Sequence, residues 1–437
     1  MLVYKFGGTS VGSPQRIKEV AKLITSDNEK KIVVLSAMSG TTNDLVAIAE
    51  YLYKNNKEGA IELVHKLKNK YEAVVNELLH TEEYQSKGKE LIDAHFDYIK
   101  SFTNDMFTLY EEKAVLAQGE LISTALMHLY LNEQQIDNKL IPALDFMRID
   151  KNEEPDAFYI KENLNRILNE NKAQNLFITQ GFICRNAYGE IDNLKRGGSD
   201  YSASLIGAAT NADEIQIWTD IDGMHNNDPR YVENTKPLSH LSFDEAAELA
   251  YFGAKILHPA SILPAKNANI PVRLKNTLQP DANGTLIDNS SEGEGIKAIA
   301  AKDNITAVKI KSGRMLLAYG FLRKVFEIFE TYKTSIDMIT TSEVAVSVTI
   351  DNTKYLTDIV DELKKFGVVE IDENQTIICV VGNFIAESKG YALKVMKALE
   401  DIPIRMISYG GSKHNVSLLV NTSDKIKALK SLNNHLF

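Results

Sequence analysis

The chain has 437 residues, 49 of them Lys or Arg and 59 Asp or Glu, which gives a formal net charge of −10. The length suggests two to four domains, and 44% hydrophobic with 25% charged residues is typical of a water-soluble globular protein. No apolar run approaches a membrane span, no export signal begins the chain, and the acidic balance argues against nucleic acid as a partner. Two distant cysteines without a CxxC motif predict no disulfide and no cysteine metal site, so a cytoplasmic protein without membrane partners is expected.

The first two-thirds of the chain alternate strand-like and helix-like segments. The predicted strands are short, rich in β-branched or aromatic residues, and bounded by Gly, Ser or Asp. They cover 2–6, 31–35, 176–180, 214–218 and 271–274. Ser13 before Pro14 is expected to cap an amphipathic helix, and most of 58–131 is expected to be helical. This alternation predicts a three-layer α/β domain with a mostly parallel sheet and a ligand at the carboxyl ends of its strands.

A linker-like stretch rich in Gly, Pro, Asn, Asp and Ser covers 279–295, and an internal repeat follows it. In the repeat, 320–325 matches 390–395, 335–339 matches 403–407, and 346–348 matches 416–418. Each copy reads helix, strand, strand, which predicts two α+β modules of about 70 residues side by side. The expected domains are therefore 1–285, 296–370 and 371–437, with a strand at about 296–304 that could belong to the second module.

Two glycine-rich segments are candidate anion sites. KFGGTS at 5–10 ends the first predicted strand, where Gly7 and Gly8 let the backbone approach a phosphate and Lys5 adds a positive charge. KRGGSD at 195–200 places two cations, two glycines, a hydroxyl and a carboxylate before another predicted helix. The first segment alone is at least as compatible with a tight turn, but a second one in the same domain is hard to explain by turns alone. Together the two segments could hold a phosphoryl donor and its acceptor.

Three further polar segments lie near the ends of predicted elements. SAMSGTTN at 36–43 offers hydroxyls that could bind an anion or simply cap a helix. The loop from Thr219 to Arg230 could hold a base and ribose, or be a solvated connection. Glu120 lies in a helical region, where it could pair with a substrate ammonium or face water. No Walker A, GxGxxG, HExxH or GxSxG motif occurs.

Several of these segments match the motifs of one enzyme family. The chain carries KFGGTSVG at 5–12, GFI at 181–183, KRGGSDYSA at 195–203, WTDIDG at 218–223, DPR at 228–230 and FGAKILHP at 252–259. In this order and spacing they resemble the monofunctional aspartate kinases, and the match covers almost the whole chain. The resemblance implies an amino-acid-kinase fold followed by two ferredoxin-like ACT domains. It also implies transfer of the γ-phosphoryl group of ATP to the side-chain carboxylate of L-aspartate, the first step of lysine, threonine and methionine biosynthesis.

The resemblance implies roles for the matching residues. Lys5 and Asp200 would be catalytic, with Asp200 orienting Lys5 toward the transferred phosphoryl group. The substrate would be bound by Ser36, Thr42, Glu120, Arg196 and Ser199, with Arg196 on a carboxylate and Glu120 on the ammonium. The ATP side would comprise Gly7, Gly8, Thr219, Asp220, His225, Arg230 and Lys255, where His225 replaces a tyrosine frequent in relatives. Mg²⁺ would be held mainly by the ATP phosphates and not by a protein metal site, and aspartate needs no general base because it is already ionised at neutral pH.

The tail resembles the lysine-sensitive type of regulatory site. The matching positions are Met315, Ala318, Phe321, Leu322, Ser335, Asp337, Glu343 and Val344. Asp337 or Glu343 would meet the cationic end of the effector, although Asp337 is also compatible with an ordinary carboxylate before a strand. Ala318 replaces a serine that is frequent in this type. Lysine inhibition is expected to act through ACT modules that pair in a homodimer or larger homo-oligomer.

Two other functions are compatible with these patterns. The chain could be another kinase of the same fold, acting on glutamate, carbamate or a nucleotide monophosphate, or a non-catalytic amino-acid sensor. The joint presence of Lys5, Glu120, Arg196 and Asp200 favours an active aspartate kinase. A fused homoserine dehydrogenase is not expected, because no GxGxxG occurs and the sequence ends after the second module.

Overall fold

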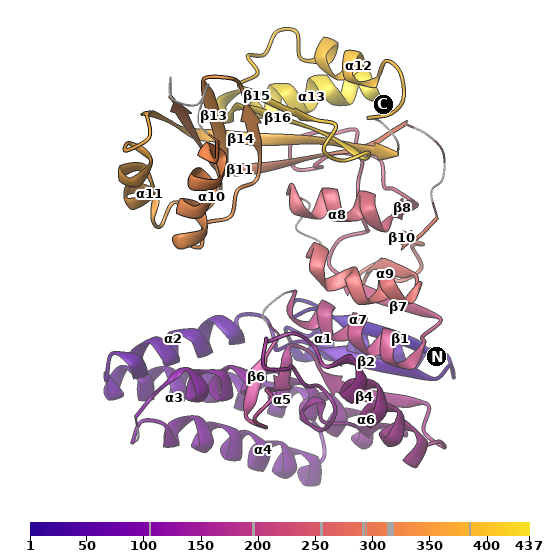
Figure 1. The fold of residues 1–437 in the computed structure, drawn as a ribbon. Coiled ribbons are helices and arrows are strands. Elements are labelled where there is room, and N and C mark those ends of the chain that lie inside the picture. The colour runs from indigo at the N-terminus through magenta and orange to yellow at the C-terminus, as the bar shows by residue number, and fades with distance from the viewer. Residues whose placement is uncertain are drawn as a thin grey trace. The chain divides into compact units, whose positions relative to one another are not determined.

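The computed structural model describes residues 1–104, 106–194, 197–253, 257–290, 293, 295–312, 319–383 and 386–437. The chain divides into two compact units (Figure 1). The first consists of Met1–Gly223 with Leu257–Asn289, and the second of Met224–Ile256 with Ser290–Phe437. These units are defined by contacts, so the domain borders expected at 285, 296 and 371 stay predictions.

A mostly parallel sheet forms the centre of the first unit, with strands in the order β3-β4-β2-β1-β7-β9-β10. The strands are β1 Leu2–Phe6, β2 Lys31–Leu35, β3 Lys139–Leu140, β4 Leu176–Gln180, β7 Glu214–Thr219, β9 Val272–Asn276 and β10 Thr285–Asp288. β1 lies between β2 and β7 and is parallel to both, whereas β10 runs antiparallel to β9. All five predicted strands are confirmed, and β1, β2 and β4 have the predicted bounds.

Helices cover both faces of this sheet and give it three layers (Figure 1). They are α1 Pro14–Ile24, α2 Thr41–Tyr53, α3 Lys57–Leu78, α4 Glu82–Ser101, α5 Leu109–Glu133, α6 Ala157–Glu170, α7 Gly198–Thr210 and α9 Leu263–Ala268, with short 3₁₀ helices at Ala143–Asp145 and Pro259–Ile262. Tyr4 and Phe6 pack into a core with residues of α1 to α5, while Val3 on the opposite face is also fully buried. The predicted cap is confirmed, because the Arg16 backbone N–H donates to Ser13 Oγ at 3.3 Å.

Helix α5 differs from what its sequence suggests. By length and composition it could cross a membrane, although no run of that length was expected from the sequence. However, 67% of its most apolar window is buried inside the protein. Its apolar character is therefore explained by its position in the core, as in many helices that pack on a sheet.

Four short strands of the first unit, β3, β5, β6 and β10, are not among the predicted strands. Residues 279–295, expected to be a linker, contain β10, which pairs with β9. β5 Ile183–Arg185 and β6 Ile191–Asn193 form an antiparallel hairpin between β4 and α7. These four strands are only two to four residues long and partly polar, so no clear alternation of apolar and polar residues marks them.

The second unit confirms the internal repeat. Its six-stranded sheet has the order β12-β13-β11-β14-β16-β15. The elements are β11 Gly295–Lys311, α10 Phe321–Thr331, β12 Ile339–Thr341, β13 Ala345–Ile350 and α11 Leu356–Leu363, then β14 Val368–Asn383, α12 Tyr391–Ala398, β15 Met406–Tyr409, β16 Asn415–Asn421 and α13 Lys425–Leu436. Each copy thus reads strand, helix, strand, strand, helix. Gly320 and Gly390 precede α10 and α12 with φ of 82° and 87°, so the same backbone requirement recurs in both copies.

Each copy has its own apolar core, and the two are joined through β11 and β14. Val308, Phe329 and Val348 belong to the core of the first copy, whereas Val380 and Leu418 belong to that of the second. β11 pairs with β14 along almost its whole length. Its first part, including most of 296–304, pairs with the end of β14 that continues into the second copy.

Helix α8, Phe243–Tyr251, packs on the six-stranded sheet of the second unit. Side chains spaced three residues apart along it reach the sheet. Glu245 is fully buried and lies 3.0 Å from Lys297 Nζ, Glu248 accepts a hydrogen bond from Asn415, and the Tyr251 hydroxyl donates to Asp337 at 3.1 Å. This spacing places all of these contacts on one face of the helix.

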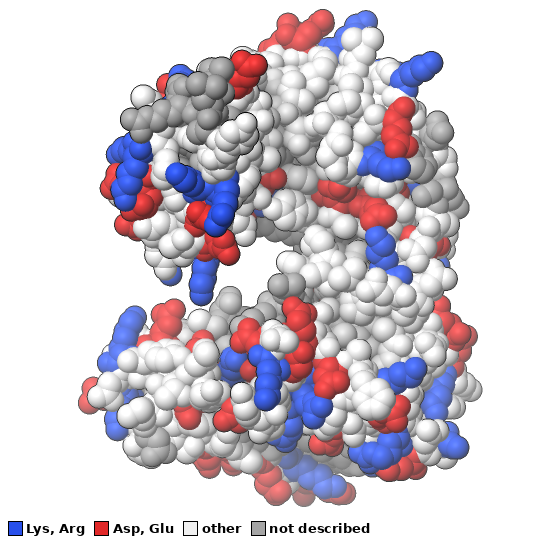
Figure 2. Space-filling model, in the orientation of Figure 1, with Lys and Arg blue, Asp and Glu red and all other residues white. Residues whose placement is uncertain are grey.

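Charged side chains of both signs are interspersed over the face shown in Figure 2. Lys and Arg do not gather into a single large patch on that face of the described chain. An anionic ligand would therefore be held by a few local groups rather than by the overall field of the protein.

The core of the first copy gives a stability prediction. Ile350 in β13 is fully buried, and we expect Ile350→Ala to lower the free energy of unfolding by about 2–5 kcal/mol, because it leaves a cavity. Val368→Ala in β14 is a matched control, because that side chain is 65% exposed and its loss should change stability by less than about 0.5 kcal/mol. Urea unfolding measures both, and equal effects would contradict the assigned core.

Candidate active site

The ion pair between Lys5 and Asp200 lies at the carboxyl end of the central strand β1. Lys5 Nζ is 2.7 Å from Asp200 Oδ1, and the two side chains are 12% and 15% exposed. Lys5 is the next-to-last residue of β1, and Asp200 lies in the first turn of α7. The parallel sheet and the helix packed on it therefore bring together two residues that are 195 positions apart.

The glycine loop after β1 packs against the loop after β2. A Cβ atom at Gly8 would lie 2.9 Å from the Ala37 carbonyl oxygen, so a larger residue there would force the backbones apart. The Ser39 N–H donates to the Gly8 carbonyl at 3.1 Å and ties the loops together. Gly7 lies beside the Lys5 ammonium, which would be 3.5 Å from a Cβ atom at this position. The absence of side chains here leaves room for a ligand next to Lys5.

Ser36 and Ser199 meet at the same edge of the sheet. Ser36 Oγ donates to Ser199 Oγ at 2.8 Å, which joins the end of β2 to the first turn of α7. Gly181 allows this approach, because a Cβ atom there would come within 2.3 Å of the Ser199 Cβ. Thr42, predicted to contact substrate, lies in the first turn of α2 with an exposed side chain.

Glu120 is a buried carboxylate that reaches the same loops from α5. It is 4% exposed, and its Oε1 accepts a hydrogen bond from the Ala37 N–H at 3.2 Å. Its Oε2 is buried without a hydrogen-bond partner in the described part of the chain. Burial raises the pKa of Glu120 to about 7, because the charged form is poorly solvated. A carboxylate with one unused oxygen is suited to accept a ligand cation.

The nucleotide-side candidates at the end of β7 are linked to the first glycine loop. Thr219 Oγ1 donates to Asp220 Oδ1 at 3.1 Å. The Thr219 carbonyl accepts from Thr277 Oγ1 at 2.6 Å, and Thr277 Oγ1 lies 3.1 Å from Ser10 Oγ. Thr219 is half-buried and Asp220 exposed, so both can be reached from solvent.

Two further nucleotide-side candidates belong to the second unit. His225 Nδ1 lies 3.0 Å from Thr235 Oγ1. Arg230 is exposed and binds Asp228 through two guanidinium nitrogens, with Nη2 at 2.6 Å from Oδ2 and Nε at 2.9 Å from Oδ1. The predicted site residues Arg196 and Lys255 lie outside the described residues.

The predicted effector residues lie in the first copy of the repeat. Phe321 is buried in its core, whereas Leu322, Ser335, Glu343 and Val344 are exposed. Met315 and Ala318 lie outside the described residues.

Asp337 already has a cationic partner within the protein. Its side chain is 1% exposed, and its Oδ1 lies 2.7 Å from Lys302 Nζ, which also contacts Asp351 at 2.9 Å. The Tyr251 hydroxyl donates to the same Oδ1, while Oδ2 is buried without a described partner. Burial raises the pKa of Asp337 above its usual range, and Lys302 opposes this shift.

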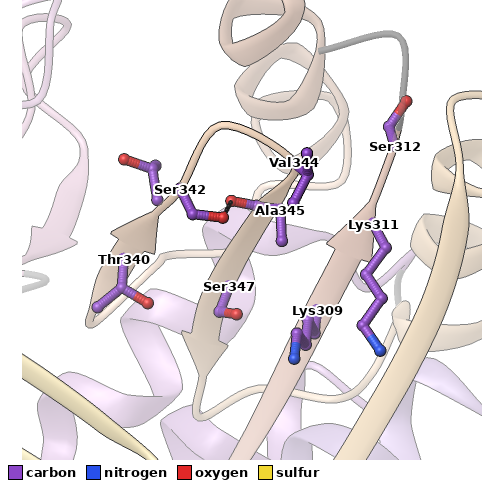
Figure 3. A pocket seen from close by; sticks show the side chains of 9 residues that line it. Lys309, Lys311, Ser312, Thr340, Ser342, Val344, Ala345 and Ser347 are labelled. Atoms are coloured by element: carbon purple, nitrogen blue, oxygen red, sulfur yellow. Dashed lines mark hydrogen bonds between the residues drawn. The ribbon is translucent and has the colours of Figure 1, made fainter. Parts of the chain in front are cut away.

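An open pocket of about 500 Å³ lies beside this region, on the first copy's part of the sheet (Figure 3). It is lined by Lys309, Lys311, Ser312, Thr340, Thr341, Ser342, Val344, Ala345 and Ser347. Lys309 and Lys311 lie on the same face of β11, and Lys311 is paired with Glu370 at 2.5 Å. Two ammonium groups and several hydroxyls make this pocket suited to a carboxylate group.

Some contacts of the site were not apparent from the sequence. The Ala37 N–H, Ser10 and Thr277 have no chemical signature of their own in the sequence. A glycine at position 119, within a stretch expected to be helical, is a sequence signal that could have pointed to close packing there. In the structure a Cβ atom at Gly119 would lie 2.8 Å from the Ala37 Cβ, so its absence lets α5 carry Glu120 close to the loop after β2.

Comparison with known proteins identifies the class. The model of the amino acid kinase family matches residues 1–276, and that of the ACT domain matches 378–436. The three-layer fold with a charged site at the carboxyl ends of β1 and β2 thus belongs to an amino acid kinase, followed by ACT modules.

Whole-chain similarity narrows this class. The chain is 35% identical over 460 residues to the lysine-sensitive aspartokinase 3 of Escherichia coli, covering 100% of this chain and 99% of that protein. The structure of E. coli aspartokinase III in complex with aspartate and ADP matches with a TM-score of 0.86 and 34% identity, over 100% of both chains. Its complex with lysine and aspartate matches with a TM-score of 0.85 and 34% identity, over 100% and 99%. The chain belongs to the aspartokinase family.

The raised pKa of Glu120 predicts how stability depends on pH. Between about pH 4.5 and 7 Glu120 keeps its proton in the folded protein but loses it in the unfolded chain. The free energy of unfolding is therefore highest below this pH window and falls as the pH rises through 7. Between roughly pH 5 and 8, we expect the free energy of unfolding of the wild type to fall by up to about 3 kcal/mol more than that of Glu120→Gln, which cannot ionise at this position.

Urea unfolding across this pH range measures the effect. Glu77→Gln on the exposed side of α3 is a matched control and should keep the pH profile of the wild type. Parallel profiles for the wild type and Glu120→Gln would disprove the raised pKa.

Proposed function

We propose that the chain phosphorylates the side-chain carboxylate of L-aspartate with ATP, giving 4-phospho-L-aspartate and ADP as the first step of lysine, threonine and methionine biosynthesis. The observation that carries this proposal is the arrangement of Glu120 and the Lys5–Asp200 pair around the ends of β1 and β2. Glu120 offers a buried oxygen for the substrate ammonium, and Lys5 offers a positive charge for the transferred group. The aspartokinase relatives support the choice of aspartate.

The reaction needs positioning and charge stabilisation more than proton transfer. An oxygen of the ionised aspartate carboxylate attacks the γ-phosphorus, the bond from that phosphorus to the β–γ bridging oxygen breaks, and ADP leaves with the electron pair. Lys5 stabilises the negative charge on the phosphoryl oxygens, and Asp200 holds the Lys5 ammonium in place. Ser36, Thr42, Ser199 and Arg196 bind the substrate in this proposal, with Arg196 on a carboxylate.

ATP is bound by the backbone at Gly7 and Gly8 together with Thr219, Asp220, His225, Arg230 and Lys255. Arg230 is now paired with Asp228, so it must exchange this partner for a phosphate. Mg²⁺ would arrive with ATP and would be held mainly by its phosphate oxygens. This suits the donor set, since no group of three or more His, Cys, Asp or Glu side chains among the described residues is placed to hold a metal.

ATP-dependent formation of aspartyl hydroxamate tests the proposal. The wild type should form the hydroxamate with L-aspartate and much less with L-glutamate. Lys5→Ala should remain folded and lower kcat by at least about 100-fold, because it removes a charge that stabilises the transition state. Near-normal turnover by Lys5→Ala would exclude Lys5 from the mechanism, and absence of hydroxamate with aspartate for the wild type would exclude the activity.

We further propose that L-lysine inhibits the enzyme at the first copy of the repeat. The E. coli relative is a lysine-sensitive aspartokinase, and one of its structures contains lysine and aspartate. Asp337 or Glu343 receives the cationic end of lysine, with Phe321, Leu322, Ser335, Val344, Met315 and Ala318 completing the site. The open pocket bordered by Val344 is not part of this proposed site, because Lys309 and Lys311 lie on the face of the sheet opposite the core that contains Phe321.

The two acidic candidates differ in their surroundings, which makes them separable. Glu343 is exposed, whereas Asp337 is buried and already paired with Lys302. The variant that removes the true partner of the effector ammonium should raise the lysine concentration for half inhibition at least about tenfold while kcat without lysine stays unchanged, as expected for loss of one charge-assisted contact. Activity measured against lysine concentration for Asp337→Asn and Glu343→Gln decides between them, and unchanged inhibition of both would exclude both residues.

We also propose that the protein works in the cytoplasm as a homodimer or larger homo-oligomer through its ACT modules. Cys184 and Cys379 are buried and free, which suits a reducing compartment. Ile339, Ile407 and Tyr409 expose apolar surface on the strands of the six-stranded sheet, which would favour burial against another copy.

A further inference from the structure

A second buried ion pair lies in the first unit, away from the reacting groups. Lys113 Nζ on α5 is 2.6 Å from Asp192 Oδ1 on β6, and the two side chains are 10% and 6% exposed. Asp192 Oδ1 also accepts the Asn193 N–H at 2.7 Å, and the residue paired with Asp192 across the hairpin is the fully buried Cys184. Burying two charges is unfavourable unless their geometry is well satisfied, and such pairs are better suited to specify an arrangement than to add stability.

Helix α5 carries Lys113 of this pair and Glu120 on the same face. Lys113 and Glu120 are seven residues apart, which is nearly two full turns and about 10 Å along the helix axis. Both side chains are buried, and Glu120 is held by the Ala37 N–H at the end of β2. α5 therefore fixes the position of Glu120 relative to Asp192, the residue that Lys113 binds.

Lys113 binds the hairpin that leads into the second glycine-rich segment. The hairpin leaves β4 through Gly181 and Phe182, and Phe182 has the unusual φ of 67°. The Phe182 N–H donates to Ser202 Oγ on α7 at 2.8 Å, and its carbonyl accepts the Leu194 N–H at 2.7 Å. Gly181 lies directly against Ser199. The base of the hairpin is thus packed on the first turns of α7, which hold Ser199 and Asp200.

We infer that the Lys113–Asp192 pair positions the two ends of the substrate site relative to each other. It links α5, whose Glu120 receives the substrate ammonium, to the hairpin and α7, whose Ser199 contacts the substrate near a carboxylate. Lys113 and Asp192 are positioning residues and touch no reacting atom. The inference rests on the proposed aspartate kinase activity and deepens it, because a fixed spacing of the two ends selects aspartate over glutamate, which is one methylene longer.

The physical reason is the rigidity of the two elements that the pair joins. Without the ion pair, the hairpin can shift relative to α5. The two ends of the substrate site are then no longer held at one spacing, and the site binds aspartate, the shorter of the two acids, less well. A shift of about 1 Å in a substrate-positioning group can lower activity up to roughly 100-fold, and one methylene is discriminated about 10- to 200-fold in rigid sites. Both effects would appear in the use of aspartate and glutamate, and not in the use of ATP.

The test compares Lys113→Met, Lys113→Arg and the double variant Lys113→Met with Asp192→Leu. We expect Lys113→Met to raise KM for aspartate at least about tenfold and to raise the ratio of kcat/KM for glutamate over aspartate by a similar factor, with KM for ATP within about threefold. Lys113→Arg keeps the charge and should retain the wild-type discrimination. The double variant replaces the pair by apolar side chains, which restores thermal stability without restoring the spacing.

The double variant keeps the test decisive if Lys113→Met does not fold. Wild-type KM and wild-type discrimination in a folded double variant would show that the pair serves stability alone and would overturn the inference. If the wild type phosphorylates aspartate and the variants keep its selectivity, only the positioning role is disproved. A wild type without aspartate kinase activity disproves the proposed function, and the inference with it.

Discussion

The Lys5–Asp200 ion pair is the interaction on which the catalytic unit depends. It joins the central strand β1 to the first turn of α7 at 2.7 Å, with both charges largely shielded from water. The strand is held in the middle of a parallel sheet, and the helix packs on it, so the charge of Lys5 has a fixed position before any ligand arrives. Charges that are already oriented and poorly solvated stabilise a transition state more strongly than charges that must first be ordered.

The position of Glu120, the second element of the site, depends on close packing between two backbone segments. Gly119 lets α5 approach Ala37, and the Ala37 N–H then satisfies one oxygen of the Glu120 carboxylate. The other oxygen is left buried without a described partner. An unused buried acceptor destabilises the protein without ligand, but it makes the binding of an ammonium group more favourable, because the ligand then removes that cost.

In the second unit, too, the fold determines the surroundings of an acidic side chain. Two copies of one strand–helix–strand–strand–helix unit share a sheet through β11 and β14, while each retains its own core. Asp337 lies two residues before β12, with Lys302 as an internal counter-ion and the Tyr251 hydroxyl as a further donor. A cationic effector that binds Asp337 would therefore compete with Lys302, whereas one that binds Glu343 would not.

The sequence by itself determined the alternation of strands and helices, the repeat, the Ser13 cap and the glycine-rich segments, because these follow from local composition and spacing. It did not reveal β10 within the polar stretch 279–295 or the β5–β6 hairpin, because strands of three or four residues become stable only when a neighbouring strand supplies their hydrogen bonds. Nor could it show that the apolar helix α5 owes its composition to burial in a core.

Only the tertiary structure decided which side chains meet. Lys5 and Asp200, Ser36 and Ser199, and Lys302 and Asp337 are distant in sequence, and each pair is brought together by strand register and helix packing. The same is true of the Ala37 N–H, a backbone group that any residue except proline could supply at that position. Residue types were therefore readable from the sequence, whereas charge pairing, burial and the unused oxygen of Glu120 depend on distances that only the folded chain defines.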